Sequence, residues 1–114
     1  MIKERTEQTK TQEYNAEGGV AFSLFDLKEF EGINQKIKQF SYVEIEIGEE
    51  VPFHEHIGNA ENYFIISGKG LYNDNGIERE VCEGTITFTP SGEGHALKNI
   101  GDDKLKFIAL VLYN

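Results

Sequence analysis

The sequence predicts an all-β domain, a sandwich or barrel of antiparallel strands. Roughly eight or more short segments rich in β-branched and aromatic residues follow one another, with turn residues between them. No segment has a convincing helical periodicity. The only two prolines, Pro52 and Pro90, fall at strand edges or bends, where a missing N–H is tolerated in a sheet.

The first part of the chain is a polar arm followed by strands. Residues 1–17 are too polar to bury much apolar surface, which predicts a loose N-terminal arm; the alternative is an arm that orders on a second subunit. Residues 20–25 are apolar and aromatic and predict a strand, while 27–35 are ambiguous, with a loop or short turn at 30–34. From residue 36 the side chains alternate between two faces, one with Ile37, Gln39, Ser41, Val43, Ile45 and Ile47, the other with Lys38, Phe40, Tyr42, Glu44 and Glu46.

The rest of the chain continues as short strands. Residues 63–67 form an apolar strand that ends at Gly68, and residues 69–72 form another. Residues 73–76, Asn-Asp-Asn-Gly, are a strong turn signal, so residues 77–82 are expected to pair back as a hairpin. Strands at 85–89, 95–100 and 104–113 complete a single domain over residues 18–114.

Composition excludes several classes of function. The 114 residues are enough for one domain and too few for two. The net charge of −9 disfavours nucleic acid, whose phosphates need a basic patch. No apolar run approaches the roughly 20 residues of a membrane span, and the N-terminus has no apolar signal region. A single cysteine, Cys82, fits a reducing compartment, so we expect a cytoplasmic protein.

All three histidines lie in two short segments that combine glycine, carboxylate and imidazole. The first has the pattern G-x5-H-x-H-x4-E-x6-G, carried by Gly48, His54, His56, Glu61 and Gly68. The second has the pattern G-x5-P-x-G-x2-H-x3-N, carried by Gly84, Pro90, Gly92, His95 and Asn99.

These segments resemble the paired motifs of the cupin superfamily, with every specified position in place, and together they cover about half the chain. The resemblance implies a double-stranded β-helix, or jelly-roll barrel, of two antiparallel sheets. In cupins the N-terminal strand often takes part in dimer contacts, so the resemblance also favours a homodimer. Cupins resemble one another while catalysing different reactions, so the fold does not fix the function.

The spacing places metal donors together. His54 and His56 lie two apart, so both imidazoles point to one face of an extended strand, and Glu61 follows a short connection, 57–60, that can fold back. His95 arrives on a strand that must neighbour the first. In the resembling family these four positions are the metal ligands. Such a set suits one divalent transition metal, Fe, Mn, Ni, Co, Cu or Zn, and leaves two positions open on an octahedral ion.

Residues near the motifs are candidates for the walls of a substrate pocket, although plain core packing explains each of them as well: Tyr42, Tyr63, Phe88, Leu97 and Phe107. Either Glu44 or Glu46 is a candidate second acid or base, with a solvated outer face as the alternative. We expect Asn99 to form hydrogen bonds at a strand or turn, Glu55 to face away from the site and Cys82 to be a small buried side chain.

Two kinds of function remain open. The first is a small-molecule metalloenzyme, for which the resemblance allows dioxygenase-type chemistry, which we favour, or isomerisation or epimerisation of a sugar. Isomerisation needs a base besides Glu61, and the sequence identifies none securely. The second is a non-catalytic module or sensor that binds a small ligand or metal.

Overall fold

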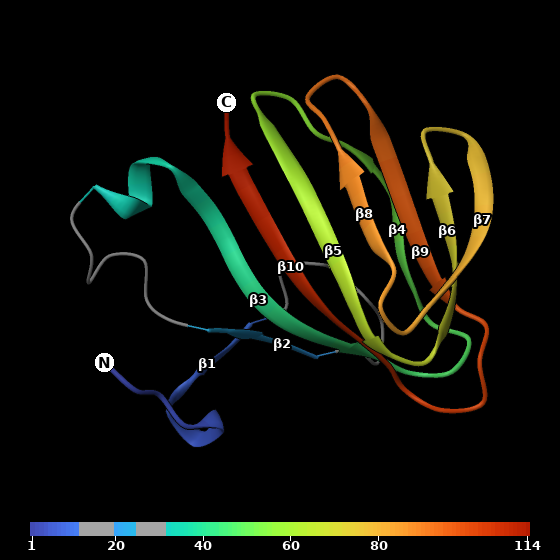
Figure 1. The fold of residues 1–114 in the computed structure, drawn as a ribbon, viewed down its shortest axis with the longest axis horizontal. Helices are drawn as coiled ribbons and strands as arrows, with labels where there is room; N and C mark the ends of the chain where they lie inside the picture. The colour runs from blue at the N-terminus through green and yellow to red at the C-terminus, as the bar shows by residue number, and fades with distance from the viewer. Residues whose placement is uncertain (12–19, 25–31) are drawn as a thin grey trace.

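The computed structural model describes residues 1–11, 20–24 and 32–114, and most of them form two antiparallel sheets (Figure 1). The six-stranded sheet has the order β1 (Thr9–Thr11), β2 (Val20–Ser23), β3 (Ile37–Ile45), β10 (Leu105–Tyr113), β5 (Asn59–Ser67), β8 (Ile86–Thr89). The four-stranded sheet has the order β4 (Glu50–Glu55), β9 (Gly94–Asn99), β6 (Lys69–Asp74), β7 (Ile77–Cys82). Two short 3₁₀ helices, η1 (Arg5–Glu7) and η3 (Ile33–Gln35), are also present. The predicted all-β class is therefore confirmed.

The hydrophobic core lies between the two sheets. Its members come from the inward faces of both: Ala21, Val43, Ile45, Val51, Tyr63, Ile65, Tyr72, Val81, Leu97, Leu105, Phe107 and Ala109. The predicted alternation of β3 agrees with this, since Val43 and Ile45 are buried. The strand ends at Ile45, however, so Ile47 leaves the predicted face and is 59% exposed.

The hairpin between β6 and β7 forms as predicted, with a shorter turn. Asp74 pairs with Ile77, so only Asn75 and Gly76 lie between the strands. Both have positive φ, 50° and 103°, which is the backbone that an Asn-Gly turn provides. The four-residue turn signal thus includes two residues that belong to β6.

The N-terminal residues that the structure describes pack on the six-stranded sheet. Strand β1 pairs with β2 of the same chain, and the Arg5 guanidinium lies over the rings of Phe22 and Tyr42, at 4.6 and 4.0 Å from their centroids. The remainder of the predicted arm (12–17), Phe25 and residues 27–31 lie outside the described residues. Within the described part of the chain, no helix is long and apolar enough to cross a membrane.

Candidate metal centre

Strands β4 and β9 bring the two histidine motifs together. His54 of β4 pairs directly with His95 of β9, and the register between them shifts after Val51. Pro52 lies at this irregularity, where its missing N–H leaves no gap in the ladder. His56 follows the end of β4, on the same side as His54. The predicted neighbourhood of the two motifs is therefore present.

Glu61 reaches the histidines from the opposite sheet. The connection before it is shorter than predicted, because Asn59 and Ala60 already belong to β5. Glu61 pairs with Val111 of β10 and Thr89 of β8, and its side chain is fully buried. The centre thus joins the two sheets across the core.

The donor atoms of the four side chains converge on one point. The Nε2 atom of His95 lies 3.1 Å from the Nε2 atoms of both His54 and His56. The Oε1 atom of Glu61 lies 2.8 Å from Nε2 of His95, 3.1 Å from that of His56 and 3.8 Å from that of His54. All four ligand atoms lie within 4.8 Å of one another.

Hydrogen bonds at the other ring nitrogen orient His54 and His56. Nδ1 of His54 donates to the carbonyl oxygen of Pro52 at 2.8 Å. Nδ1 of His56 donates to Oδ1 of Asn59 at 2.5 Å, and the Asn59 amide donates to the carbonyl of Ile57. A proton on Nδ1 leaves the Nε2 lone pair free to point at the centre, which is the tautomer that a metal requires.

His95 is held by a buried hydroxyl pair. Its Nδ1 lies 2.8 Å from the hydroxyl of Tyr72 and 3.0 Å from that of Thr89, and these two hydroxyls lie 2.8 Å apart. The ring of Tyr63 stacks on the imidazole, with centroids 4.9 Å apart and planes at 25°. Packing and hydrogen bonding together fix this ligand more firmly than the other two histidines.

Burial and the Glu61 carboxylate shift the protonation of the ligands in opposite directions. The hydrogen bond that protonated His56 donates to Glu61 raises the pKa of His56, against the effect of burial. Burial lowers the pKa of His95, which is fully enclosed, against the effect of Glu61. Burial also raises the pKa values of Tyr63 and Tyr72, so both phenols stay protonated. Protonation of His56 therefore competes with metal binding more than protonation of His95 does.

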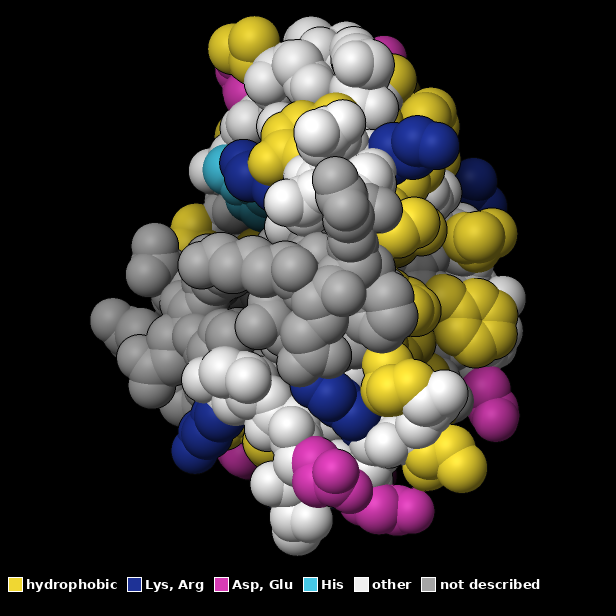
Figure 2. Space-filling view, turned by 90° about the vertical axis from the view of Figure 1, so that its left-hand side faces the viewer, with side chains coloured by type: hydrophobic (Ala, Val, Ile, Leu, Met, Phe, Trp, Pro, Cys, Tyr) yellow, Lys and Arg dark blue, Asp and Glu magenta, His cyan; other side chains and the backbone are white. Residues whose placement is uncertain are grey.

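The donor set fits a divalent transition metal. Three imidazole lone pairs and one carboxylate, facing each other inside a core, are the ligands that such ions prefer. Without an ion, three lone pairs would face a buried negative charge, which is an unfavourable arrangement. The side chain of His54 is 36% exposed, whereas those of Glu61 and His95 are fully buried, so the centre reaches solvent beside His54. A histidine is visible at the surface in Figure 2.

Three of the five predicted wall residues lie in the core near the centre. Tyr63 contacts His95 and also packs against Phe107, with ring centroids 4.6 Å apart. Leu97 is buried on the inward face of β9, two residues from His95.

Tyr42 and Phe88 lie elsewhere. Tyr42 faces away from the core and stacks on Phe22, and its hydroxyl donates to Glu44 at 2.8 Å. Burial, with Glu44 next, raises the pKa of Tyr42 to about 12. Phe88 is 56% exposed on the outer face of β8. Both residues alternate with inward neighbours, and the sequence alone did not say which face was inward.

The two carboxylates considered as a second acid or base point away from the centre. Glu44 and Glu46 lie 3.6 and 3.8 Å from the Lys104 ammonium, on the outer side of the sheet. Glu55 is exposed, as predicted from its alternation with the histidines. Asn99 forms the predicted hydrogen bonds, since its amide donates to the carbonyls of Ile45 and Asp103.

The prediction for Cys82 was wrong. It is exposed rather than buried, because β7 is the edge strand of its sheet and Val81 takes the inward position.

Sequence reasoning missed the residues that orient the imidazoles. Tyr72 and Thr89 come from β6 and β8, in different sheets; Tyr72 lies between the two histidine motifs, and Thr89 is an unspecified position of the second. Asn59 had a signal, because a polar amide three residues after His56 can cap its ring nitrogen. Only the packing of the sheets brings Tyr72 to His95.

Comparison with known proteins decides the family. The Cupin domain family matches residues 41–112, which is more than half of the chain. The chain is a cupin. A curated relative, the oxalate-binding protein of Thermotoga maritima, is 31% identical over 98% of this chain and 93% of its own length. An uncharacterised protein of Methanocaldococcus jannaschii is 26% identical over 91% of this chain and 82% of its own.

Solved structures agree with the cupin fold. A predicted oxalate decarboxylase from Thermotoga maritima has a TM-score of 0.85 and 29% identity, with both chains fully covered. The polyketide cyclase RemF from Streptomyces resistomycificus has a TM-score of 0.76 and 20% identity over 99% of this chain and 80% of its own. The jelly-roll architecture expected from the cupin motifs is thereby confirmed, and the second likeness concerns the fold alone.

Proposed function

We propose that this cupin binds one divalent transition metal through His54, His56, Glu61 and His95, and that the metal holds a small oxygen-chelating carboxylate such as oxalate. The observation that carries the proposal is the convergence of three Nε2 atoms on the buried Glu61 carboxylate. Four protein ligands on an octahedral ion leave two positions, which a chelating carboxylate fills. The relative named as an oxalate-binding protein supports this ligand class.

Charge supports an anionic ligand. Neutral imidazoles and one carboxylate leave about one net positive charge on a divalent ion. Within a chain of net charge −9, that positive charge attracts a carboxylate to one place.

Binding is favoured over isomerisation because the buried polar residues offer few proton carriers. Among the described residues these are Ser41, His56, Asn59, Glu61, Thr87, Thr89, His95 and Asn99. Of these, only the proposed ligands His56, Glu61 and His95 are acids or bases near neutral pH. A sugar isomerase or epimerase needs such a group beside the substrate. Dioxygenation needs only the two open positions, and it stays our second candidate.

Metal analysis tests the site. Protein purified without chelator is expected to contain about one divalent ion per chain, and His54→Ala with His95→Ala is expected to lose it. Glu55→Ala is the matched control, because Glu55 alternates with the histidines and is exposed. A metal-free wild type whose composition does not respond to these substitutions contradicts the proposal.

Ligand assays then separate the candidate functions. We expect isothermal titration of the metal-loaded protein with oxalate to show saturable binding that chelator treatment abolishes. Oxygen consumption with diols, thiols and β-diketones tests dioxygenation, and a reducing-sugar panel without oxygen tests isomerisation. Oxygen uptake with one of these substrates makes the protein an enzyme, whereas oxalate binding without turnover in any panel supports the binding module.

The homodimer is likewise a proposal. Phe64, Ile86 and Phe88 are 48%, 67% and 56% exposed and lie together on the outer face of β5 and β8, where Phe64 pairs with Ile86. Figure 2 shows hydrophobic side chains gathered along one side of the molecule. The outward positions of these paired strands carry no acidic residue, so two copies of net charge −9 can meet there without opposing carboxylates. Sedimentation of Phe64→Glu with Phe88→Glu is expected to give a monomer where the wild type gives a dimer.

The cytoplasmic location and the division into an arm of residues 1–17 and a domain of residues 18–114 stay predictions of the sequence.

A further inference from the structure

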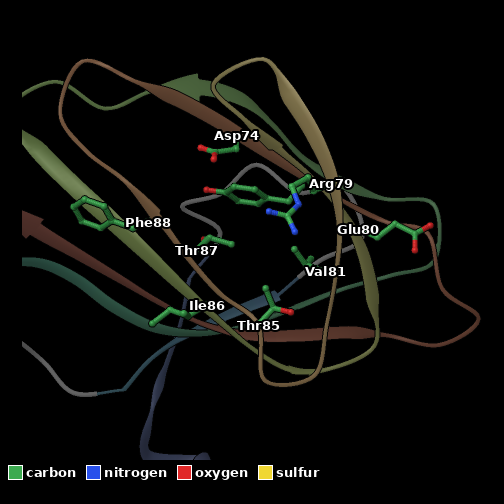
Figure 3. A pocket seen from close by; sticks show the side chains of 9 residues that line it. Asp74, Arg79, Glu80, Val81, Thr85, Ile86, Thr87 and Phe88 are labelled. Carbon is green, nitrogen blue, oxygen red and sulfur yellow. The ribbon is translucent and has the colours of Figure 1, made fainter.

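A cavity of about 280 Å³ lies between the edge strands β7 and β8, on the far side of Tyr72 from the metal centre (Figure 3). Its wall includes both an arginine and a carboxylate, the side chains of Arg79 and Asp74. The Tyr72 ring separates the cavity from His95, so the cavity is distinct from the proposed metal site.

The two charges in this wall stand apart from each other. Tyr72 pairs directly with Arg79 and Asp74 pairs with Ile77, so Asp74 and Arg79 are diagonal neighbours across the hairpin, a spacing of about 7–8 Å between backbones. In the described part of the chain, neither side chain makes an ion pair or a side-chain hydrogen bond. Glu80, the other carboxylate of the wall, lies 3.4 Å from the ammonium of Lys69. One positive and one negative group therefore remain for a ligand.

The rest of the wall is suited to a small amphiphilic molecule. Val81, Ile86 and Phe88 supply apolar surface, and Thr85 and Thr87 add hydroxyl groups to the wall. Each hydroxyl accepts a backbone N–H, from Cys82 at 3.1 Å and from Tyr63 at 3.3 Å, and the Thr85 hydroxyl also donates to Sγ of Cys82 at 4.0 Å.

We propose that this cavity is a second ligand site that takes a small zwitterion, an α-amino acid with a short apolar side chain. Its carboxylate binds the Arg79 guanidinium, which can offer two parallel N–H donors. Its ammonium binds the Asp74 carboxylate, and its side chain packs on Val81 and Ile86. A plain anion is disfavoured because Asp74 repels it, and a plain cation because Arg79 does. The site does not depend on the proposed metal function.

Titration of the full-length, isotope-labelled protein with L-valine tests the proposal. The protein is treated with chelator, because amino acids also coordinate metals. We expect saturable shifts of the Thr85 and Thr87 amide resonances. Arg79→Gln is expected to weaken binding tenfold or more, on the order of one lost charge-assisted hydrogen-bond pair. Arg79→Lys keeps the positive charge but cannot offer two parallel N–H donors. Its affinity for L-valine is expected to lie between those of the wild type and Arg79→Gln. Lys104→Gln, which removes the same charge elsewhere, is expected to bind as the wild type.

Asp74→Asn separates a zwitterion site from an anion site. It is expected to weaken L-valine binding and to strengthen the binding of isovalerate (3-methylbutanoate), the analogue without the ammonium group. Equal L-valine binding by wild type and Arg79→Gln overturns the proposal, as does the absence of a saturable shift at β8. Shifts confined to the histidine resonances also overturn it, because they place the amino acid at the metal centre. His54→Ala keeps the two failures distinguishable, since it is expected to lose metal and retain L-valine binding.

Discussion

Above the raised pKa of His56, where no imidazolium remains there to pair with it, the fully buried Glu61 carboxylate is expected to destabilise the metal-free protein. Glu61→Gln keeps the shape and removes the charge, and its amide can donate to the Nε2 lone pairs. We therefore expect the variant to raise the free energy of unfolding of the metal-free protein by about 1–3 kcal/mol. For a domain of this size, each kcal/mol corresponds to roughly 4–8 °C in melting temperature.

Metal reduces this difference in stability. A free metal concentration of about 100 times the dissociation constant stabilises the wild type by about 2.7 kcal/mol. If losing the charged ligand weakens the site about a hundredfold, the same metal concentration stabilises Glu61→Gln by only about 0.4 kcal/mol. The advantage of the variant therefore shrinks by about 2.3 kcal/mol when metal is added.

Thermal and chemical denaturation, followed by circular dichroism with chelator and with metal, measures both effects. Glu44→Gln is the control, because Glu44 is a partly exposed carboxylate beside Lys104, outside the centre. Two results together refute this reasoning. They are a Glu61→Gln variant that is less stable than the wild type in chelator, and a stabilisation of that variant by metal as large as that of the wild type.

Three further predictions concern the groups around the centre. Tyr72→Phe removes a hydroxyl that orients His95, so metal affinity is expected to fall about 10- to 100-fold in a competition titration, and unchanged affinity contradicts this role. Metal binding is expected to weaken as pH falls through the raised pKa of His56, with the loss starting above pH 6.5. Asn59→Ala removes a group that raises this pKa, so the midpoint of metal loss in a pH titration is expected to move to lower pH. An unmoved midpoint contradicts the assignment of this pH dependence to His56. Gly70→Ala places a methyl group 2.7 Å from a leucine side chain in the core, so its free energy of unfolding, measured with denaturant, is expected to fall by about 1–3 kcal/mol. A variant as stable as the wild type contradicts this close packing.

The local patterns in the sequence predicted the strands well where the chain alternates strongly. The hairpin around Asn75 and Gly76 and the alternation of β3 depend on short-range preferences, so they could be inferred without the fold. The same patterns could not say which face of an isolated strand is inward. Tyr42 and Phe88, taken as wall candidates, face outward for this reason, and Cys82 is exposed because β7 is an edge strand.

The sequence by itself determined the four candidate ligands: a spacing of two places His54 and His56 on one face of a strand, and the resemblance to the cupin motifs implies Glu61 and His95 as well. Only the tertiary structure decided that Glu61 meets them from the opposite sheet, and that Tyr72 orients His95 from a separate strand. The physical reason is that local spacing fixes the direction of a side chain relative to its own strand. The packing of two sheets fixes which distant side chains share a buried point and what charge that point carries.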